Sequence, residues 1–282
     1  MAADVGEPAA SGQVHRVAPR SLLELPIREL AAAIRFLTRV PLPAGAFATS
    51  LERAPAEPRT GGAAFGIVGL GLGAIGAVPI VFGAAAHPVP AALIALGTLA
   101  VLSGALHLDG LADTADALAA PAGTADRART DPRTGSAAVV ALLIVIGLDA
   151  ALVAELSTRG TLAAATAFLV AAVGSRASAP IWAVLVGRRS AGPAGGGLGR
   201  WFAERTSPAA AIVAALSGLA VAAGLAAIAG PWLIGAAVAG SLLAAALGGA
   251  IVAARGGLDG DGYGALIEIA FTSVLLAAVV VR

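Results

Sequence analysis

The sequence contains no cysteine and no lysine, and charged residues make up only 12% of its 282 positions. The absence of cysteine excludes disulfides, cysteine-ligated zinc and thiol nucleophiles. The absence of lysine excludes Schiff-base chemistry and a P-loop lysine. A soluble domain normally carries about 25% charged residues. A chain this poor in charge cannot cover a globular surface with polar groups, so its solvent is expected to be largely lipid.

Hydrophobic residues make up 58% of the chain, aromatic residues only 4%, and the mean hydropathy is +0.89. The apolar mass is therefore mostly alanine, glycine, valine and leucine, and small residues suit helices that approach closely in a bilayer. The alternative is a soluble alanine-rich bundle, which would need a charged face on each helix. Most of the apolar segments have none. We predict an all-α, polytopic integral membrane bundle of about seven transmembrane helices.

Seven apolar runs approach the length of about 20 residues that crosses a bilayer. They are residues 63–86, 91–106, 136–156, 162–186, 209–229, 232–254 and 266–281. The second and seventh runs are short, so we expect their helices to extend into the neighbouring loops. The first run has glycines at three- and four-residue spacing, which predicts a tight helix–helix contact.

The N-terminal residues divide into two parts. Residues 1–20 contain no apolar run, so we expect a disordered tail rather than a signal peptide. Residues 21–62 carry leucine and isoleucine at helical spacing, with arginines among them, and this pattern predicts an amphipathic interfacial segment. Residues 63–282 then form the transmembrane catalytic domain.

Arginine is distributed unequally between the loops. Fifteen of the 18 arginines lie before the first run or in the loops after the second, fourth and sixth runs. The positive-inside rule places these loops in the cytoplasm. We therefore predict a multi-pass protein of the bacterial cytoplasmic (inner) membrane with a cytoplasmic N-terminus and an active site facing the cytoplasm.

An acidic motif, HLDGLADTAD, follows the second run at residues 107–116. On a helix, Asp109, Asp113 and Asp116 share one face. Three stacked carboxylates repel one another unless a cation joins them, and hard oxygen ligands favour Mg²⁺ or Mn²⁺. The alternative is an ordinary solvated helix end. His107 fits a ligand or general base, and equally a polar residue at the membrane boundary.

A glycine-rich stretch, residues 255–264, enters the seventh run, and Glu268 follows inside it. Glycines let backbone amides approach an anion closely. Asp261 and Glu268 share a face if the helix starts early, and a carboxylate inside an apolar span is a functional candidate. The alternative is a flexible loop with Glu268 facing a water-filled cleft. The EF-hand spacing is not met.

Two arginines are candidates for phosphate binding. Arg133 precedes the third run and either clamps a phosphate or anchors the loop in the cytoplasm. Arg176 lies inside the fourth run and needs a partner or a hydrated cavity. Asp149 and Glu155 in the third run are expected to lie nearer the opposite membrane face, too far away to serve.

Together these segments resemble the cobalamin synthase family (adenosylcobinamide-GDP ribazoletransferase). The most specific match is residues 107–116, and residues 256–265 with Glu268 match a glycine-rich motif of that family. Residues 36–43, 131–135, 175–176 and 197–199 also have counterparts. The sequence departs from the family in three places: the stretch between the acidic motif and residue 131 is short, Asp259 replaces threonine, and an acid expected after Glu268 is missing.

The resemblance implies that α-ribazole or its 5′-phosphate attacks adenosylcobinamide-GDP, a phosphodiester forms and GMP leaves. As the resemblance implies them, the catalytic residues would be Asp113, Asp261, Glu268, Arg133 and Arg176. The substrate-binding residues would be His107, Gly256, Gly257, Gly260 and Arg39. The metal ligands, for Mg²⁺, would be Asp109, Asp113 and Asp116. No nucleic-acid partner is expected, and homo-oligomer formation is left open.

Two other functions remain as alternatives. A CDP-alcohol phosphotransferase would require Ala-Arg two residues after Asp109-Gly110, and that pair is absent. A transporter would place its acids near the middle of the membrane on broken helices, whereas the two acidic motifs are predicted at one face. If the enzyme interpretation holds, the helices carrying the two motifs pack side by side, with the carboxylates of both facing one cleft.

Overall fold

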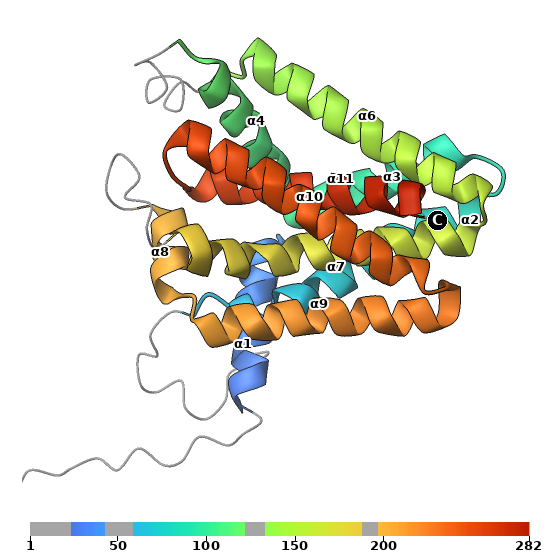
Figure 1. Ribbon diagram of the computed structural model, residues 1–282, viewed down its shortest axis with the longest axis horizontal. Helices are drawn as coiled ribbons and strands as arrows, with labels where there is room; N and C mark the ends of the chain where they lie inside the picture. Colours follow the sequence, from blue (N-terminus) through green and yellow to red (C-terminus); the bar gives the residue numbers. More distant parts are fainter. Residues whose placement is uncertain (1–23, 43–58, 122–132, 188–196, 282) are drawn as a thin grey trace, which may run out of the picture.

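The computed structural model describes residues 24–42, 59–121, 133–187 and 197–281, and within these ranges the chain is helical with no strand (Figure 1). The helices are α1 (Glu24–Leu37), η1 (Gly62–Ala64), α2 (Phe65–Gly83), α3 (Pro88–Ser103), α4 (Leu106–Ala119), α6 (Ser136–Thr158), α7 (Thr161–Trp182), the π-helical turn η2 (Ala183–Gly187), α8 (Leu198–Arg205), α9 (Pro208–Ala229), α10 (Trp232–Arg255) and α11 (Gly260–Val281). The all-α prediction is confirmed.

Six helical segments are long and apolar enough to cross a membrane. They are Gly62–Gly83, Ser136–Thr158, Thr161–Gly187, Pro208–Ala229, Trp232–Arg255 and Gly260–Val281. The pair α3 and α4 makes a seventh if it is counted as one broken span. The expected count of about seven is therefore confirmed. As expected, the last helix extends beyond its apolar run, because it begins at Gly260.

The second predicted span differs from its prediction because α3 has only 16 residues and then turns by 93° into α4. Gly104 adopts the left-handed conformation (φ 63°), and so does Ala105 (φ 56°), which is uncommon for a residue with a Cβ. The Ala105 N–H donates to the Ala100 carbonyl (2.7 Å), which caps the end of α3. The acidic motif therefore starts a new helix in a new direction.

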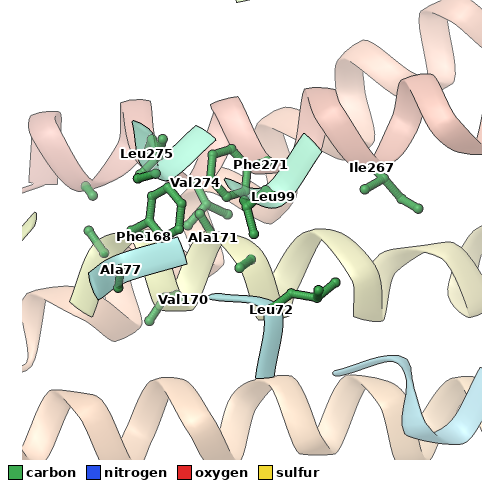
Figure 2. Packing of buried hydrophobic residues seen from close by; sticks show 14 of the residues in the cluster. Leu72, Ala77, Leu99, Phe168, Val170, Ala171, Ile267, Phe271, Val274 and Leu275 are labelled. Carbon is green, nitrogen blue, oxygen red and sulfur yellow. The ribbon is translucent and has the colours of Figure 1, made fainter. Parts of the chain in front are cut away.

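The long helices lie alongside one another (Figure 1). In the core, the Phe168 ring of α7 meets the Phe271 ring of α11 edge to face at 5.3 Å (Figure 2). The glycines of α2 allow it to lie directly against α7, since a Cβ at Gly69 would stand 2.6 Å from the Ala172 carbonyl oxygen. This confirms the predicted close contact of the first span.

Helix α1 runs across the long helices (Figure 1) and is joined to them through aromatic rings. Phe36 lies 5.6 Å from Phe65 of α2 and 5.1 Å from Phe202 of α8, measured between ring centroids. Its helical, amphipathic character is as expected, while its place at the membrane interface stays a prediction. The predicted tail, residues 1–20, lies outside the described residues.

Candidate active site

The acidic motif occupies the amphipathic helix α4, outside the six continuous spans. Asp109 is exposed and Asp113 is half-buried. The third carboxylate, Asp116, points at the start of α6. Its Oδ2 accepts a hydrogen bond from the Gly135 N–H (2.7 Å), and its Oδ1 accepts one from the Ala138 N–H (2.9 Å). Asp116 thus caps α6, because these amides have no partner within their own helix.

The glycine-rich stretch is organised around Asp259 and Arg255. The Asp259 Oδ1 accepts a hydrogen bond from the Gly262 N–H (2.9 Å), which caps the start of α11. Its Oδ2 lies 2.8 Å from Arg255 Nη2. Through its other nitrogen, Nη1, Arg255 donates to the Thr114 hydroxyl of α4 (2.7 Å). Arg255 therefore ties the end of α10 both to the start of α11 and to the acidic helix.

The two motifs, about 150 residues apart in sequence, meet where α4 crosses α11. A Cβ at Gly110 would stand 2.6 Å from the Asp261 carbonyl oxygen, and one at Gly264 would stand 3.2 Å from the His107 carbonyl oxygen. Only glycines allow backbones to approach so closely. The predicted side-by-side packing of the two motif helices is thus confirmed.

The pKa of Asp113 is also affected by the proximity of the two motifs. Partial burial raises the pKa of its carboxyl above the usual value, and the negative charge of Asp261 on α11 adds to the increase. Asp109 and Asp116 act in the same direction, whereas the Arg255 guanidinium lowers this pKa. A carboxylate surrounded by three others is a place where a cation would be favourable.

No three His, Asp or Glu side chains within the described ranges are arranged to hold a metal ion by themselves. Magnesium is typically bound by one or two protein carboxylates together with substrate phosphates. The donor set here fits that pattern, since Asp109, Asp113 and Asp261 offer hard oxygens at the point where the motifs meet. Asp116 differs from them, because both of its oxygens already accept backbone hydrogen bonds.

The other acidic candidate, Glu268, lies deeper and belongs to a second group. Its Oε1 is 3.8 Å from Nδ1 of His107, a ring that is only 3% exposed. Arg176, 2% exposed, shares a cavity of about 160 Å³ with Glu268 and Asp149. This cavity lies between α3, α6, α7 and α11, beneath the start of α4.

The expectation that Asp149 lies too near the opposite face to accompany Arg176 is wrong, because both side chains line this cavity. At 1.5 Å per residue, Asp149 lies about 20 Å along α6 from the acidic end of the bundle. Arg176 lies about 16 Å from the same end of its own span. Similar depths on neighbouring helices bring the two side chains together.

The remaining predicted residues surround the acidic end. Gly256 ends α10 in the left-handed conformation (φ 69°), followed by Gly257, and Gly260 begins α11 beside Gly199 of α8. The Arg39 side chain lies against Gly104 at the α3–α4 bend.

Arg133 is exposed just before α6, close in sequence to Gly135, which donates to Asp116. Sequence reasoning assigned no role to Thr114 or Asp259. The four-residue spacing from Arg255 to Asp259 was the only signal for that ion pair.

The model of the cobalamin-5-phosphate synthase family matches residues 29–279. The chain belongs to this family. The match extends from α1 through almost all of α11, so it includes both acidic motifs and the spans that position them. No solved structure matches the chain.

Individual relatives agree with the family assignment. A Pseudomonas paraeruginosa protein named adenosylcobinamide-GDP ribazoletransferase is 35% identical over 266 residues, covering 89% of this chain and 97% of that protein. A Brucella canis protein with the same name is 39% identical over 149 residues, 52% of this chain and 55% of that protein. A Brucella suis protein matches to the same extent.

Proposed function

We propose that this protein is an adenosylcobinamide-GDP ribazoletransferase, as its relatives are named, and that the crossing of α4 and α11 is its reaction centre. The observation that carries the proposal is the contact of Gly110 with the Asp261 backbone. It brings the carboxylates of both family motifs to one end of the bundle. Membership in the family indicates the class of reaction, and the crossing of α4 and α11 is where we expect that reaction to take place.

In the proposed reaction, a ribose hydroxyl of α-ribazole or its 5′-phosphate attacks the phosphorus next to cobinamide. The new O–P bond replaces the pyrophosphate bond, GMP leaves, and the hydroxyl proton passes to a carboxylate. Asp261 suits this proton transfer, because it stands at the first turn of α11 facing the acids of α4. Glu268, the other candidate base, lies seven residues further into the span.

Asp109 and Asp113 would hold Mg²⁺ together with substrate phosphate oxygens, and the ion would neutralise charge that develops on the departing phosphate. Asp116 fixes α4, which carries these ligands, against the start of α6, and Asp259 caps α11. Arg133 lies at the same end of the bundle, and the resemblance implies that it binds a substrate phosphate. The clamp role expected for Arg176 stays a prediction, since this side chain lines the inner cavity.

The decisive experiment measures conversion of adenosylcobinamide-GDP and α-ribazole to cobalamin by the purified protein in detergent. We expect turnover that is abolished by EDTA and restored by Mg²⁺. Asp113→Asn should lose nearly all turnover at an unchanged melting temperature, because it removes one ligand charge at almost constant shape. Glu204→Gln is the matched control, since Glu204 is exposed and pairs with Arg200 on the surface of α8. Full turnover by Asp113→Asn, or turnover that survives EDTA, would reject the magnesium assignment.

We further propose that the acidic end faces the cytoplasm of a bacterial inner membrane. The unequal distribution of arginine supports this orientation, and the long apolar helices support a membrane location. The chain has no cysteine of its own, so single introduced cysteines report orientation directly. A cysteine at Gly257 should react only from the cytoplasmic side and one at Gly230 only from the other side. The reverse labelling pattern would overturn the orientation.

A further inference from the structure

The lining of the inner cavity is of two chemical kinds. Its apolar groups include Leu93, Gly97 and the ring of Phe271. Its polar side chains are those of Asp149, Arg176 and Glu268, with Ser103 at the end of α3. Charged side chains at this depth of a membrane protein are costly and mark functional sites. The cavity therefore combines apolar groups with charged ones.

Among the described residues, Nε of Arg176 has no hydrogen-bond partner, and Oδ1 of Asp149 has none of good geometry, although the Thr272 hydroxyl lies beside that carboxyl. Both side chains are only 2% exposed. The Arg176 guanidinium is otherwise held by the Ser175 hydroxyl (3.0 Å) and stands 5.9 Å from the centre of the Phe271 ring. Burying a donor without a partner is unfavourable. The cavity thus presents a donor, Arg176 Nε, whose hydrogen bond a ligand could complete.

We propose that this cavity binds the flat heteroaromatic base of the acceptor nucleoside, α-ribazole; the proposal rests on the function proposed above. An apolar cavity of about 150 Å³ binds benzene, so about 160 Å³ suits a small ring system. It is far too small for a corrin ring. The ring nitrogen that is not bonded to ribose would accept a hydrogen bond from Arg176 Nε, while the faces of the ring would lie against the Phe271 ring and the leucines.

The cavity adjoins the helix that carries the acidic motif. Leu108 lines it, and the residue that follows Leu108 is Asp109 of the acidic motif. On α11, Glu268 lies about 10 Å from Asp261, at 1.5 Å per residue, a span comparable with the length of a nucleoside. A nucleoside with its base beside Arg176 would therefore extend its ribose toward the carboxylates at the crossing.

The competing occupant is a lipid acyl chain. Leu93 is 47% exposed and Gly97 is also exposed, so this part of the lining reaches the outer surface of the bundle. A lipid chain has no acceptor for the Arg176 Nε–H, whereas the free ring nitrogen of a heteroaromatic base is one. This difference favours the base.

The test narrows the cavity at Gly97, where a Cβ would meet no atom within 4 Å, so the substitution does not disturb the helix packing. The variant is Gly97→Leu. The control is Gly71→Leu on α2, which is exposed, also has open space at the Cβ position and lies outside the cavity. Both replace a glycine inside a helix, so both should melt at or above the wild-type temperature.

For Gly97→Leu we expect the KM for α-ribazole to rise at least tenfold, while the KM for adenosylcobinamide-GDP stays within twofold of wild type. Equilibrium dialysis of α-ribazole alone against protein in nanodiscs should show the same loss of affinity, and Gly71→Leu should match wild type in both assays. An unchanged KM for α-ribazole in an active Gly97→Leu enzyme would overturn the base pocket and leave the proposed function standing.

Three other outcomes would also decide whether the cavity binds the base. An equal rise in the KM of both substrates would overturn the pocket, because it would show a general disturbance of the site. Unchanged α-ribazole affinity together with loss of a co-purifying lipid, seen by native mass spectrometry, would assign the cavity to an acyl chain. Wild-type protein that binds α-ribazole in dialysis but turns over no substrate would support the pocket and reject the proposed function.

Discussion

Asp116 gives a direct way to separate carboxylates that hold the fold from those that perform chemistry. Its two oxygens accept hydrogen bonds of 2.7 and 2.9 Å from the first amides of α6. Asp116→Asn keeps one acceptor and replaces the other with an amide group that cannot accept. It also removes a negative charge from the N-terminus of a helix, where the helix dipole favours one.

Losing a helix cap costs about 0.5–2 kcal/mol, and hydrogen bonds to charged groups contribute about 1.5–3 kcal/mol. Because this site is only partly buried, we expect Asp116→Asn to lower the free energy of unfolding by about 2 kcal/mol. For a chain of this size that corresponds to a fall in melting temperature of about 4–8 °C. The melting temperature is to be measured in detergent with EDTA present, so that loss of a metal ligand does not contribute.

Asp109→Asn is the matched control, since Asp109 lies two turns earlier on α4 and is exposed. We expect its melting temperature to change by no more than the equivalent of about 0.5 kcal/mol, while its turnover collapses. Hydrogen exchange at the first turn of α6 should accelerate in Asp116→Asn alone. If Asp116→Asn melts like wild type in EDTA and loses activity as Asp109→Asn does, the capping role is wrong and Asp116 acts as a ligand.

Gly110→Ala should abolish turnover and lower the free energy of unfolding by about 1–3 kcal/mol, because the new Cβ would meet the Asp261 carbonyl oxygen. Thermal melting measures the loss of stability, and Gly71→Ala is the control, since a Cβ there would meet no atom within 4 Å. A fully active Gly110→Ala would contradict the close crossing. Arg255→Gln should lower the free energy of unfolding by about 1.5–3 kcal/mol, because it disrupts a largely buried ion pair. Arg200→Gln, which breaks a solvent-exposed ion pair, should lower the free energy of unfolding much less, and equal effects in the two variants would refute this ranking.

Much of the fold could be predicted because the bilayer imposes a length on apolar segments. The shared face of the three aspartates followed from helical periodicity alone, and α4 is a helix as that required. The bend between α3 and α4 could not be predicted, since it depends on a left-handed conformation at Ala105 as well as Gly104. Alanine in that conformation gives no sequence signal, because it normally favours helix.

The site was harder to predict than the fold, because its residues acquire their roles through contacts between helices. Asp109 and Asp116 are equivalent on a helical wheel, yet only Asp116 meets the start of another helix. Asp259, where the family usually has threonine, caps α11 through a side-chain oxygen. Threonine can cap in the same way, so this departure is conservative at the cap. It also adds a charge that pairs with Arg255.

The charged cavity bears on the choice between an enzyme and a transporter. Sequence reasoning set transport aside because the acidic motifs lie at one face, yet Asp149, Arg176 and Glu268 meet deep inside the bundle. Membership in the cobalamin-5-phosphate synthase family decides for an enzyme. The deep charges then fit a role in catalysis or substrate binding, because apolar residues of similar volume can often replace a whole set of buried charges without loss of stability.

The base pocket proposed here also offers a reason for the membrane setting of a reaction whose nucleotide substrates are soluble in water. The cavity is formed by α3, α6, α7 and α11 together, of which the last three are continuous spans. An apolar slot with buried charges needs long, rigid walls that keep water from the charges, and a bundle of spans in lipid provides them. The membrane spans would then form the binding site of the acceptor nucleoside themselves, and the carboxylates at the acidic end would carry out the phosphate transfer.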